Sequence, residues 1–104
     1  MTASAQIEQD VFEKVKKGAI VLFAYQGRVW DGNVIRVDRN ISPPTATLVW
    51  LEGHSTRTEY VPVEEILSVY DKSAPEMRLG DFRGPGVLLP AGIQWQKDHP
   101  SEHA

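Results

Sequence analysis

Short β-rich runs separated by glycine, proline and asparagine fill the chain between Ala19 and Tyr70, and this spacing constrains the fold more than any other feature. Such runs are typical of strands, because they are too short for stable helices. Gly32 predicts a bend within one of them, and Pro62 ends another because proline has no N–H to donate. A single helical turn is predicted at residues 63–66. We predict five strands, at residues 19–25, 28–37, 45–51, 55–61 and 67–70.

Five short strands with one helical turn before the last predict a mainly β fold, namely a small SH3-like five-stranded barrel. An open β-sheet with a helix packed on one face is the alternative. The 104 residues suffice for one domain of ordinary size. We therefore predict a short helix within residues 1–17, a barrel at 18–72 and an irregular extension at 73–104.

The predicted N-terminal helix, at residues 4–17, depends on a four-residue apolar period. Ile7, Val11 and Val15 recur at that spacing, Ser4 can cap the start, and Gly18 is a suitable residue to follow the end. An amphipathic helix of this kind buries one face against the rest of the protein.

The C-terminal extension is rich in residues that interrupt regular structure, with four of the seven prolines and four of the eight glycines. We predict a turn-rich loop at residues 78–86 and fraying at the chain end. Phe82, Leu88 and Leu89 are nevertheless too apolar for a solvated linker, which favours packing against the barrel. The alternative is a strip that docks a partner.

Composition excludes several classes of protein. There is no cysteine, so disulfides, thiol catalysis and cysteine–zinc sites are excluded. The net charge is −3 and no segment is basic, which counts against nucleic-acid binding. The longest apolar run, Ala19–Tyr25, is far too short to span a membrane, and the first residues lack a signal-peptide pattern. We expect a soluble, intracellular protein, cytoplasmic or nuclear.

No cluster of residues predicts catalysis, a metal site or a cofactor. His54 lies in a predicted turn beside Ser55, but neighbours on a hairpin point to opposite faces and do not assemble a triad. Glu64 and Glu65 fall in the exposed helical turn, whereas an acid–base pair needs one buried carboxyl group. The sequence therefore predicts a protein that is not an enzyme.

Aromatic residues near the predicted strand ends give the stronger functional signal. Trp50, flanked by apolar residues, is predicted to lie in the core. Tyr25, Trp30 and Tyr60 are predicted to line the lip of a groove, with Asp31 as an acidic partner. Rings in this arrangement attract cations, with each contact contributing roughly 0.5–2 kcal/mol. The alternative is a barrel filled by its own aromatic side chains.

Four stretches of the sequence resemble Tudor domains. Residues 18–24 (GAIVLFA) resemble the first strand of that family and residues 27–34 (GRVWDGNV) the second. Residues 48–53 (LVWLEG) resemble the third strand and turn, and residues 60–66 (YVPVEEI) the closing strand and turn. Within this superfamily, residues 50–56 (WLEGHST) and 63–69 (VEEILSV) are most similar to the N-terminal globular domain of the microtubule-depolymerising kinesin-thirteen motors, and the resemblance covers residues 18–72. It implies a Tudor-like barrel that binds a protein or peptide segment, with a methylated Lys or Arg held in an aromatic cage. The motor domain and its phosphate-binding loop are absent from this sequence.

We accordingly predict a non-catalytic interaction module that recognises a protein or peptide segment. A nucleic-acid-binding barrel is the first alternative, since bases stack on exposed aromatic rings. The second alternative is a small oligomeric enzyme or inhibitor of mobile-element origin, whose site lies between subunits. The sequence leaves the oligomeric state open.

Overall fold

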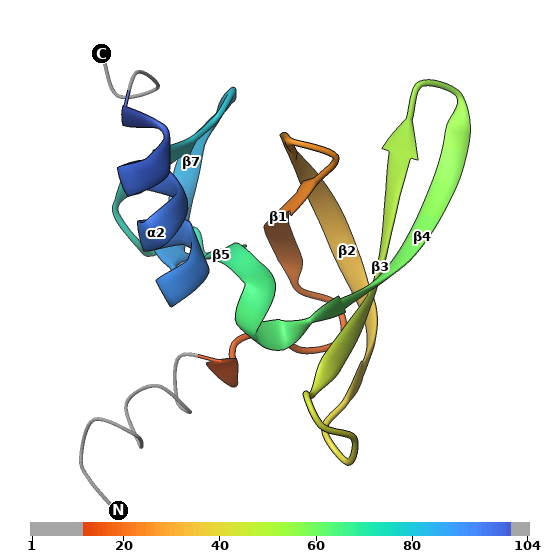
Figure 1. Cartoon of the computed structure of the whole chain (residues 1–104). Helices are drawn as coiled ribbons and strands as arrows, with labels where there is room; N and C mark the ends of the chain where they lie inside the picture. The colour runs from red at the N-terminus through yellow and green to blue at the C-terminus, as the bar shows by residue number, and fades with distance from the viewer. Residues whose placement is uncertain (1–11, 101–104) are drawn as a thin grey trace, which may run out of the picture.

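The structure is a computed structural model that describes residues 12–100, and it is mainly β, as predicted. The described residues form seven strands, one 3₁₀ turn and one C-terminal helix (Figure 1). In chain order these are β1 (Ile20–Tyr25), β2 (Arg28–Asp38), β3 (Thr45–Glu52), β4 (Ser55–Pro62), η1 (Val63–Glu65), β5 (Ile66–Tyr70), β6 (Glu76–Leu79), β7 (Phe82–Leu88) and α2 (Pro90–Asp98). All five strands predicted before residue 71 are present.

The strands form one open antiparallel sheet in the order β4-β3-β2-β1-β5-β7-β6. The predicted five-stranded barrel is therefore wrong, and the open-sheet alternative describes the arrangement of the strands. Closing a barrel would require β5 to use its second edge on β4. That edge is instead paired with β7, through Ser68–Leu88, Val69–Val87 and Tyr70–Gly86.

Tight turns set the path of the first four strands. Gln26 and Gly27 both have positive φ, at 51° and 78°, which is the requirement of a type I′ turn between β1 and β2. Gly53, with φ of 63°, begins the two-residue turn between β3 and β4. β2 pairs with β1 up to Asn33 and with β3 from Asn33 onward, so the strand changes partner beside Gly32.

A β-bulge on β5 determines which side chains face which side of the sheet. Leu22 pairs with Ser68 and the next residue, Phe23, pairs with Ile66, so Leu67 is an extra residue opposite β1. We call the side that carries Phe23 the inner face and the side that carries Leu22 the outer face. Because of the bulge, Leu67 and Ser68 both lie toward the outer face.

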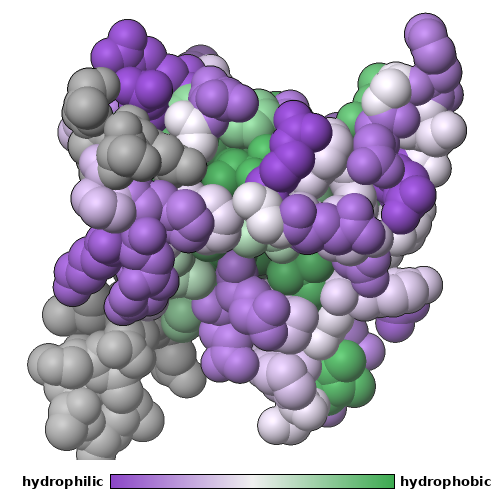
Figure 2. Space-filling model, turned by 45° about the horizontal axis from the view of Figure 1, so that its top comes forward, coloured by the Kyte–Doolittle hydropathy of each residue, from purple (hydrophilic) through white to green (hydrophobic). Residues whose placement is uncertain are grey.

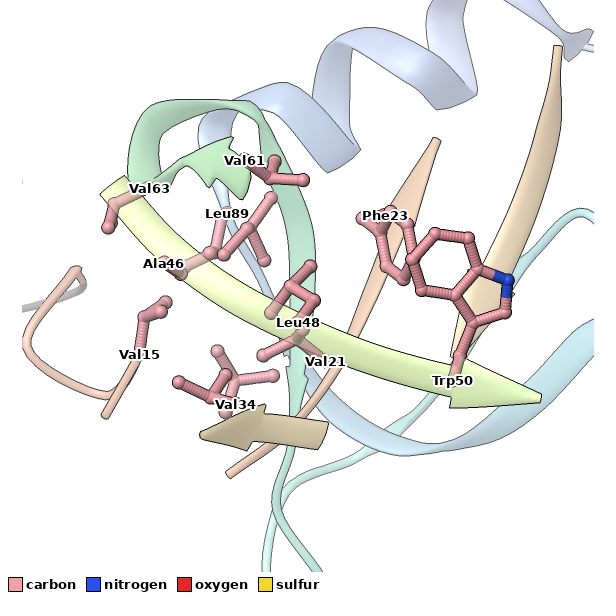
Figure 3. Packing of buried hydrophobic residues seen from close by; sticks show 12 residues of the cluster. Val15, Val21, Phe23, Val34, Ala46, Leu48, Trp50, Val61, Val63 and Leu89 are labelled. Carbon is pink, nitrogen blue, oxygen red and sulfur yellow. The ribbon is translucent and has the colours of Figure 1, made fainter. Parts of the chain in front are cut away.

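The main core lies on the inner face, where the first five strands curve around it. Phe23 and Trp50 fill one end and small aliphatic residues fill the other (Figure 3). Three members come from outside these strands. Val15 precedes β1, Val63 lies in η1 and Leu89 follows β7, and all three are buried. The buried members of this cluster are Val15, Val21, Phe23, Val34, Ala46, Leu48, Trp50, Val61, Val63, Ile66, Val69 and Leu89.

A second core lies on the outer face, between β1–β5 and the C-terminal elements. Leu22, Leu67 and Leu79 are buried there, and Phe82 and Trp95 pack against them. The irregular C-terminal extension that we predicted is therefore wrong, because residues 76–98 form β6, β7 and α2. The prediction that this segment packs on the preceding strands is consistent with the structure, in which Leu89 is fully buried.

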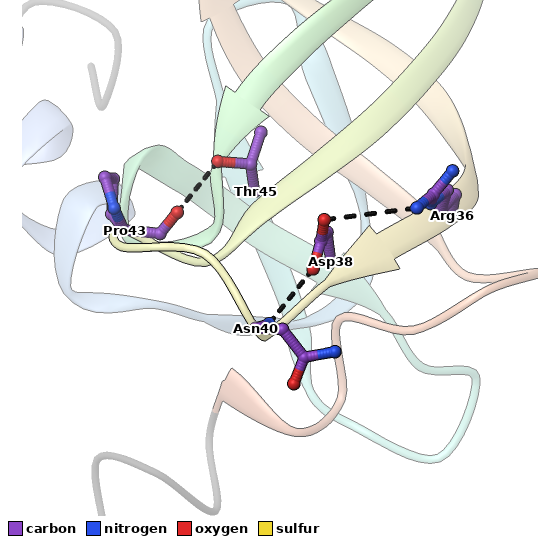
Figure 4. Close-up of polar contacts among 5 residues, drawn as sticks. All are labelled: Arg36, Asp38, Asn40, Pro43 and Thr45. Atoms are coloured by element: carbon purple, nitrogen blue, oxygen red, sulfur yellow. Dashed lines mark hydrogen bonds and ion pairs between the residues drawn. The ribbon is translucent and has the colours of Figure 1, made fainter.

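The segment before β1 is attached to the loop between β2 and β3. Arg39 donates from Nη2 to the carbonyl oxygen of Val15 at 2.6 Å. The same loop is shaped by Asp38, which accepts the Asn40 N–H at 3.0 Å, and by the Thr45 hydroxyl, which donates to the Pro43 carbonyl at 2.9 Å (Figure 4). Most of the predicted helix at residues 4–17 lies outside the described residues. Of the rest, Phe12 is helical, residues 13, 14 and 17 lie in turns and residues 15–16 are irregular.

Candidate binding surface

Four aromatic rings gather where the β1–β2 turn lies beside the β3–β4 hairpin, and we call them the aromatic end. Phe23 and Trp30 are register partners on the inner face of β1 and β2. Trp50 contacts both, with ring centroids 4.9 Å from Phe23 at an interplanar angle of 71° and 6.2 Å from Trp30 at 44°. Tyr25 completes the group, 5.3 Å from Trp50. These are the separations at which edge-to-face and tilted rings attract one another.

Exposure differs sharply within the aromatic end. Trp50 is only 4% exposed, which confirms its predicted core position. Tyr25 and Trp30 are half-buried, and the Trp30 Nε1–H donates to the Tyr25 carbonyl oxygen at 3.2 Å. The polar neighbours of Trp30 in the sequence suggest an exposed ring, but the ring is half-buried and its N–H is hydrogen-bonded. At the aromatic end, the rings of Tyr25 and Trp30 are partly accessible to solvent, whereas the ring of Trp50 is buried.

Two arginines of the chain itself cover these rings. The Arg28 guanidinium lies 4.8 Å from the Trp30 ring centroid, and the Arg57 guanidinium lies 6.0 Å from that of Tyr25. Arg57 also donates from Nη2 to the Tyr25 hydroxyl at 3.1 Å and pairs with Glu52 at 3.6 Å. The hydrogen bond to Tyr25 is the main cause of the raised pKa of Arg57. A ligand cation would therefore compete with these guanidinium groups for the same ring faces.

The four predicted site residues are divided between the two faces of the sheet, and only Tyr25 and Trp30 meet. Tyr25 and Trp30 meet at the aromatic end. Asp31 follows Trp30 directly in β2, so its exposed side chain lies on the outer face, opposite Leu22. Tyr60 pairs with Thr47 on the outer face and is 69% exposed. The structure therefore does not bring these four residues together into one cage.

A recess of about 180 Å³ on the outer face is a second candidate site. Met77, Phe82 and Tyr70 form apolar walls, Asp31 is at its edge, and Ser68 lies within its lining. The Ser68 hydroxyl is buried and has no hydrogen-bond partner among the described residues. Sequence reasoning missed Ser68. The signal was a lone serine between apolar residues of a strand, but only the bulge turns it toward this recess.

Replacing Ser68 with alanine is expected to raise the free energy of unfolding by about 1 kcal/mol, because a buried hydroxyl without a partner is costly. Urea unfolding monitored by tryptophan fluorescence measures the change. The exposed Ser55, changed to alanine, is the matched control and should leave stability unchanged. A clear loss of stability on Ser68→Ala would instead show that the hydroxyl makes a stabilising hydrogen bond.

Other candidate residues lie apart from these two places. His54 is exposed in the β3–β4 turn, and Glu64 and Glu65 are exposed in η1. Residues 12–100 contain no group of three or more metal-ligating side chains. Polar side chains cover most of the face shown in Figure 2, with hydrophobic groups visible in recesses between them. Among the described helices, none has both the length and the apolar character to span a bilayer.

Comparison of the chain with protein-family models, with curated proteins and with solved structures found no match.

Proposed function

We propose that this protein is a non-catalytic interaction module that binds an extended protein segment at its aromatic end. The connectivity of β1–β5 supports this proposal. Four strands follow one another as a meander, a single 3₁₀ turn follows, and β5 returns to pair with β1. This is the connectivity of SH3-like and Tudor-like domains, to which the sequence pattern of residues 18–72 is also similar. Domains of this kind bind peptides in grooves lined by aromatic residues.

The chemistry of the ligand follows from one observation, namely that the half-exposed rings carry their own guanidinium groups. Arg28 covers Trp30, and among residues 12–100 no ion pair to Arg28 is formed. Its donors are therefore available to a carboxylate, while the ring beside it offers apolar contact area. We propose that the preferred segment carries an acidic residue next to an apolar or aromatic one, rather than a methylated cation.

Selection from a random peptide library displayed on phage tests this ligand chemistry. The full chain is immobilised, and peptides that bind the support without the protein are removed. Enriched sequences should share an acidic residue beside an apolar one. Enrichment of lysine-rich peptides, or no enrichment above background, would contradict the proposal.

Charge reversal at Arg28 is expected to weaken binding of a selected peptide by about tenfold or more, because the reversed charge repels the peptide carboxylate. Fluorescence anisotropy of the labelled peptide measures the dissociation constant. Arg36→Glu is the matched control, since Arg36 lies in the same strand with its side chain 73% exposed, and it should leave binding unchanged. Equal losses in both variants would show that only general charge matters.

Nucleic acid is the second candidate ligand, because an arginine stacked on a tryptophan also provides a platform for a base. A labelled single-stranded RNA and a labelled single-stranded DNA, titrated with the full chain at several salt concentrations, separate the two ligands. Binding that is tighter than that of the selected peptides and falls steeply with salt would favour nucleic acid.

A further inference from the structure

β4 is an unpaired edge of the sheet. It pairs with β3 along its whole length and is the last strand in the order on that side (Figure 1). The opposite end of the sheet is β6, a strand of only four residues over which α2 packs. An edge strand presents a row of unpaired N–H and C=O groups that can accept another strand. β4 is eight residues long and offers the longer row.

The turn between β3 and β4 determines which groups of β4 point outward. Glu52 and Ser55 flank a two-residue turn, so this pair exchanges hydrogen bonds, and such pairs then alternate along the ladder. The peptide groups of Thr56, Thr58 and Tyr60 consequently face away from β3. In the single chain the Tyr60 N–H donates to the Glu59 carboxylate at 3.3 Å, and a second strand would replace this contact. Pro62 is next in this series and has no N–H, which ends the usable edge.

Only one symmetric register suits these groups. If two copies of β4 pair antiparallel about Thr58, Thr58 faces its own copy and Thr56 faces Tyr60 of the second copy. All the outward N–H and C=O groups of these residues are then paired. By symmetry, Arg57 of each copy lies opposite Glu59 of the other copy. A two-fold axis at Arg57 or at Glu59 places like charges opposite each other, which is destabilising. An axis at Thr56 or Tyr60 runs into the turn or into Pro62.

We propose that two copies of this chain form a symmetric dimer by pairing their β4 strands antiparallel about Thr58. Charge complementarity selects this occupant over an unrelated strand. Glu59 has no ion pair within residues 12–100 and lies two residues from Arg57 on the same face of the strand. Self-pairing brings the Glu59 carboxylate next to Arg57 of the second copy, whose guanidinium also pairs with Glu52 of its own chain at 3.6 Å.

The exposed apolar residues of this hairpin support the same register. Leu51 and Tyr60 are each 69% exposed, and both lie on the outer face. In the dimer, Tyr60 of the second copy is next to Thr56, and Thr56 is next to Leu51 in the same cross-strand row. One continuous outer face therefore forms across the two-fold axis. Because Arg57 contacts Tyr25, the two aromatic ends then lie close to that axis.

Sedimentation of the full chain at rising concentration tests the dimer. The mass should approach twice the 11.6 kDa of one chain at concentrations up to about 1 mM. Thr58→Pro should remain monomeric over the same range, because it removes the N–H at the axis, while proline is tolerated at a sheet edge. Thermal unfolding of this variant confirms that it is folded. A wild-type chain that stays monomeric at the highest concentration overturns the proposal.

A charge exchange tests the register independently. Glu59→Arg alone, and Arg57→Glu alone, should each weaken dimerisation by about tenfold or more, because like charges then face each other. The double variant Arg57→Glu/Glu59→Arg should recover most of the affinity. Glu64→Arg, in η1 away from the edge, is the control and should not change it. Single variants that dimerise as well as the wild type would place the interface elsewhere and overturn the proposed pairing.

Discussion

Trp50→Ala is expected to lower the free energy of unfolding by roughly 3–5 kcal/mol, as truncation of a large buried side chain does. The Trp50 ring is 4% exposed and contacts Phe23, Tyr25 and Trp30, so its removal leaves a cavity that three rings border. The indole N–H has no partner among the described residues, and its loss therefore adds no further cost. Chemical denaturation monitored by circular dichroism measures the effect.

Leu51→Ala is the matched control for this experiment. Leu51 is the next residue in β3 and is 69% exposed on the outer face, so its truncation should cost less than about 1 kcal/mol. A loss for Trp50→Ala as small as that for Leu51→Ala would mean that the aromatic end is not part of the core. The four rings of the aromatic end would then adopt a fixed arrangement only when a ligand is bound.

Gly92→Ala is expected to destabilise the protein by about 3 kcal/mol, although the same exchange in an ordinary helix stabilises by about 1 kcal/mol. Gly92 is buried in α2, against the backbone of β5. A Cβ atom there would lie 2.0 Å from the Leu67 carbonyl oxygen, which is far inside contact distance. The obstacle is backbone rather than a flexible side chain, so the helix must move away from the sheet.

Gly84→Ala is the control, since a Cβ at Gly84 meets no atom within 4 Å. Thermal unfolding of both variants compares them directly, and only Gly92→Ala should lower the melting temperature strongly. Displacement of the helix should also change the fluorescence of Trp95 relative to the wild type, because Trp95 packs against the second core. Equal melting temperatures for the two variants would show that α2 does not depend on this close approach.

The strands of the first seventy residues could be predicted because their pattern is local. Alternating apolar residues, glycine at turns and proline at strand ends determine strand positions without knowledge of the partners. Trp50 could be assigned to the core for the same reason, since it lies between apolar neighbours. Whether the five strands close into a barrel depends instead on which strand takes the free edge of β5, and no local signal in β7 encodes that pairing.

The C-terminal elements could not be predicted because tertiary contacts override local preference there. Residues 84–86 (Gly-Pro-Gly) interrupt any strand pattern, yet they lie within β7 and pair with Met77, Glu76 and Tyr70. Gly92 weakens a helix prediction, yet its missing side chain is what allows α2 to approach β5. Residues that disfavour regular structure in isolation are thus required for close packing.

The candidate site was predictable only in part. The alternation of side chains along a strand explains which residues were placed correctly and which were not. Tyr25 and Trp30 were expected to meet because a tight turn joins their strands. Asp31 follows Trp30 directly, so a consistent use of the two-residue period places it on the other face. Arg28 lies two residues before Trp30, and the same period places both on one face. The position of Arg57 could not be foreseen, because it reaches Tyr25 from a strand that is distant in sequence.

The position of Leu89 has a consequence for the order in which this protein folds during synthesis. Strands β1–β5 have all been translated by Tyr70, but the core on their inner face includes Leu89, nineteen residues later. These five strands therefore have no complete core while the chain is still being extended. A chain that terminates between these two positions is expected to be more sensitive to proteases than the full chain.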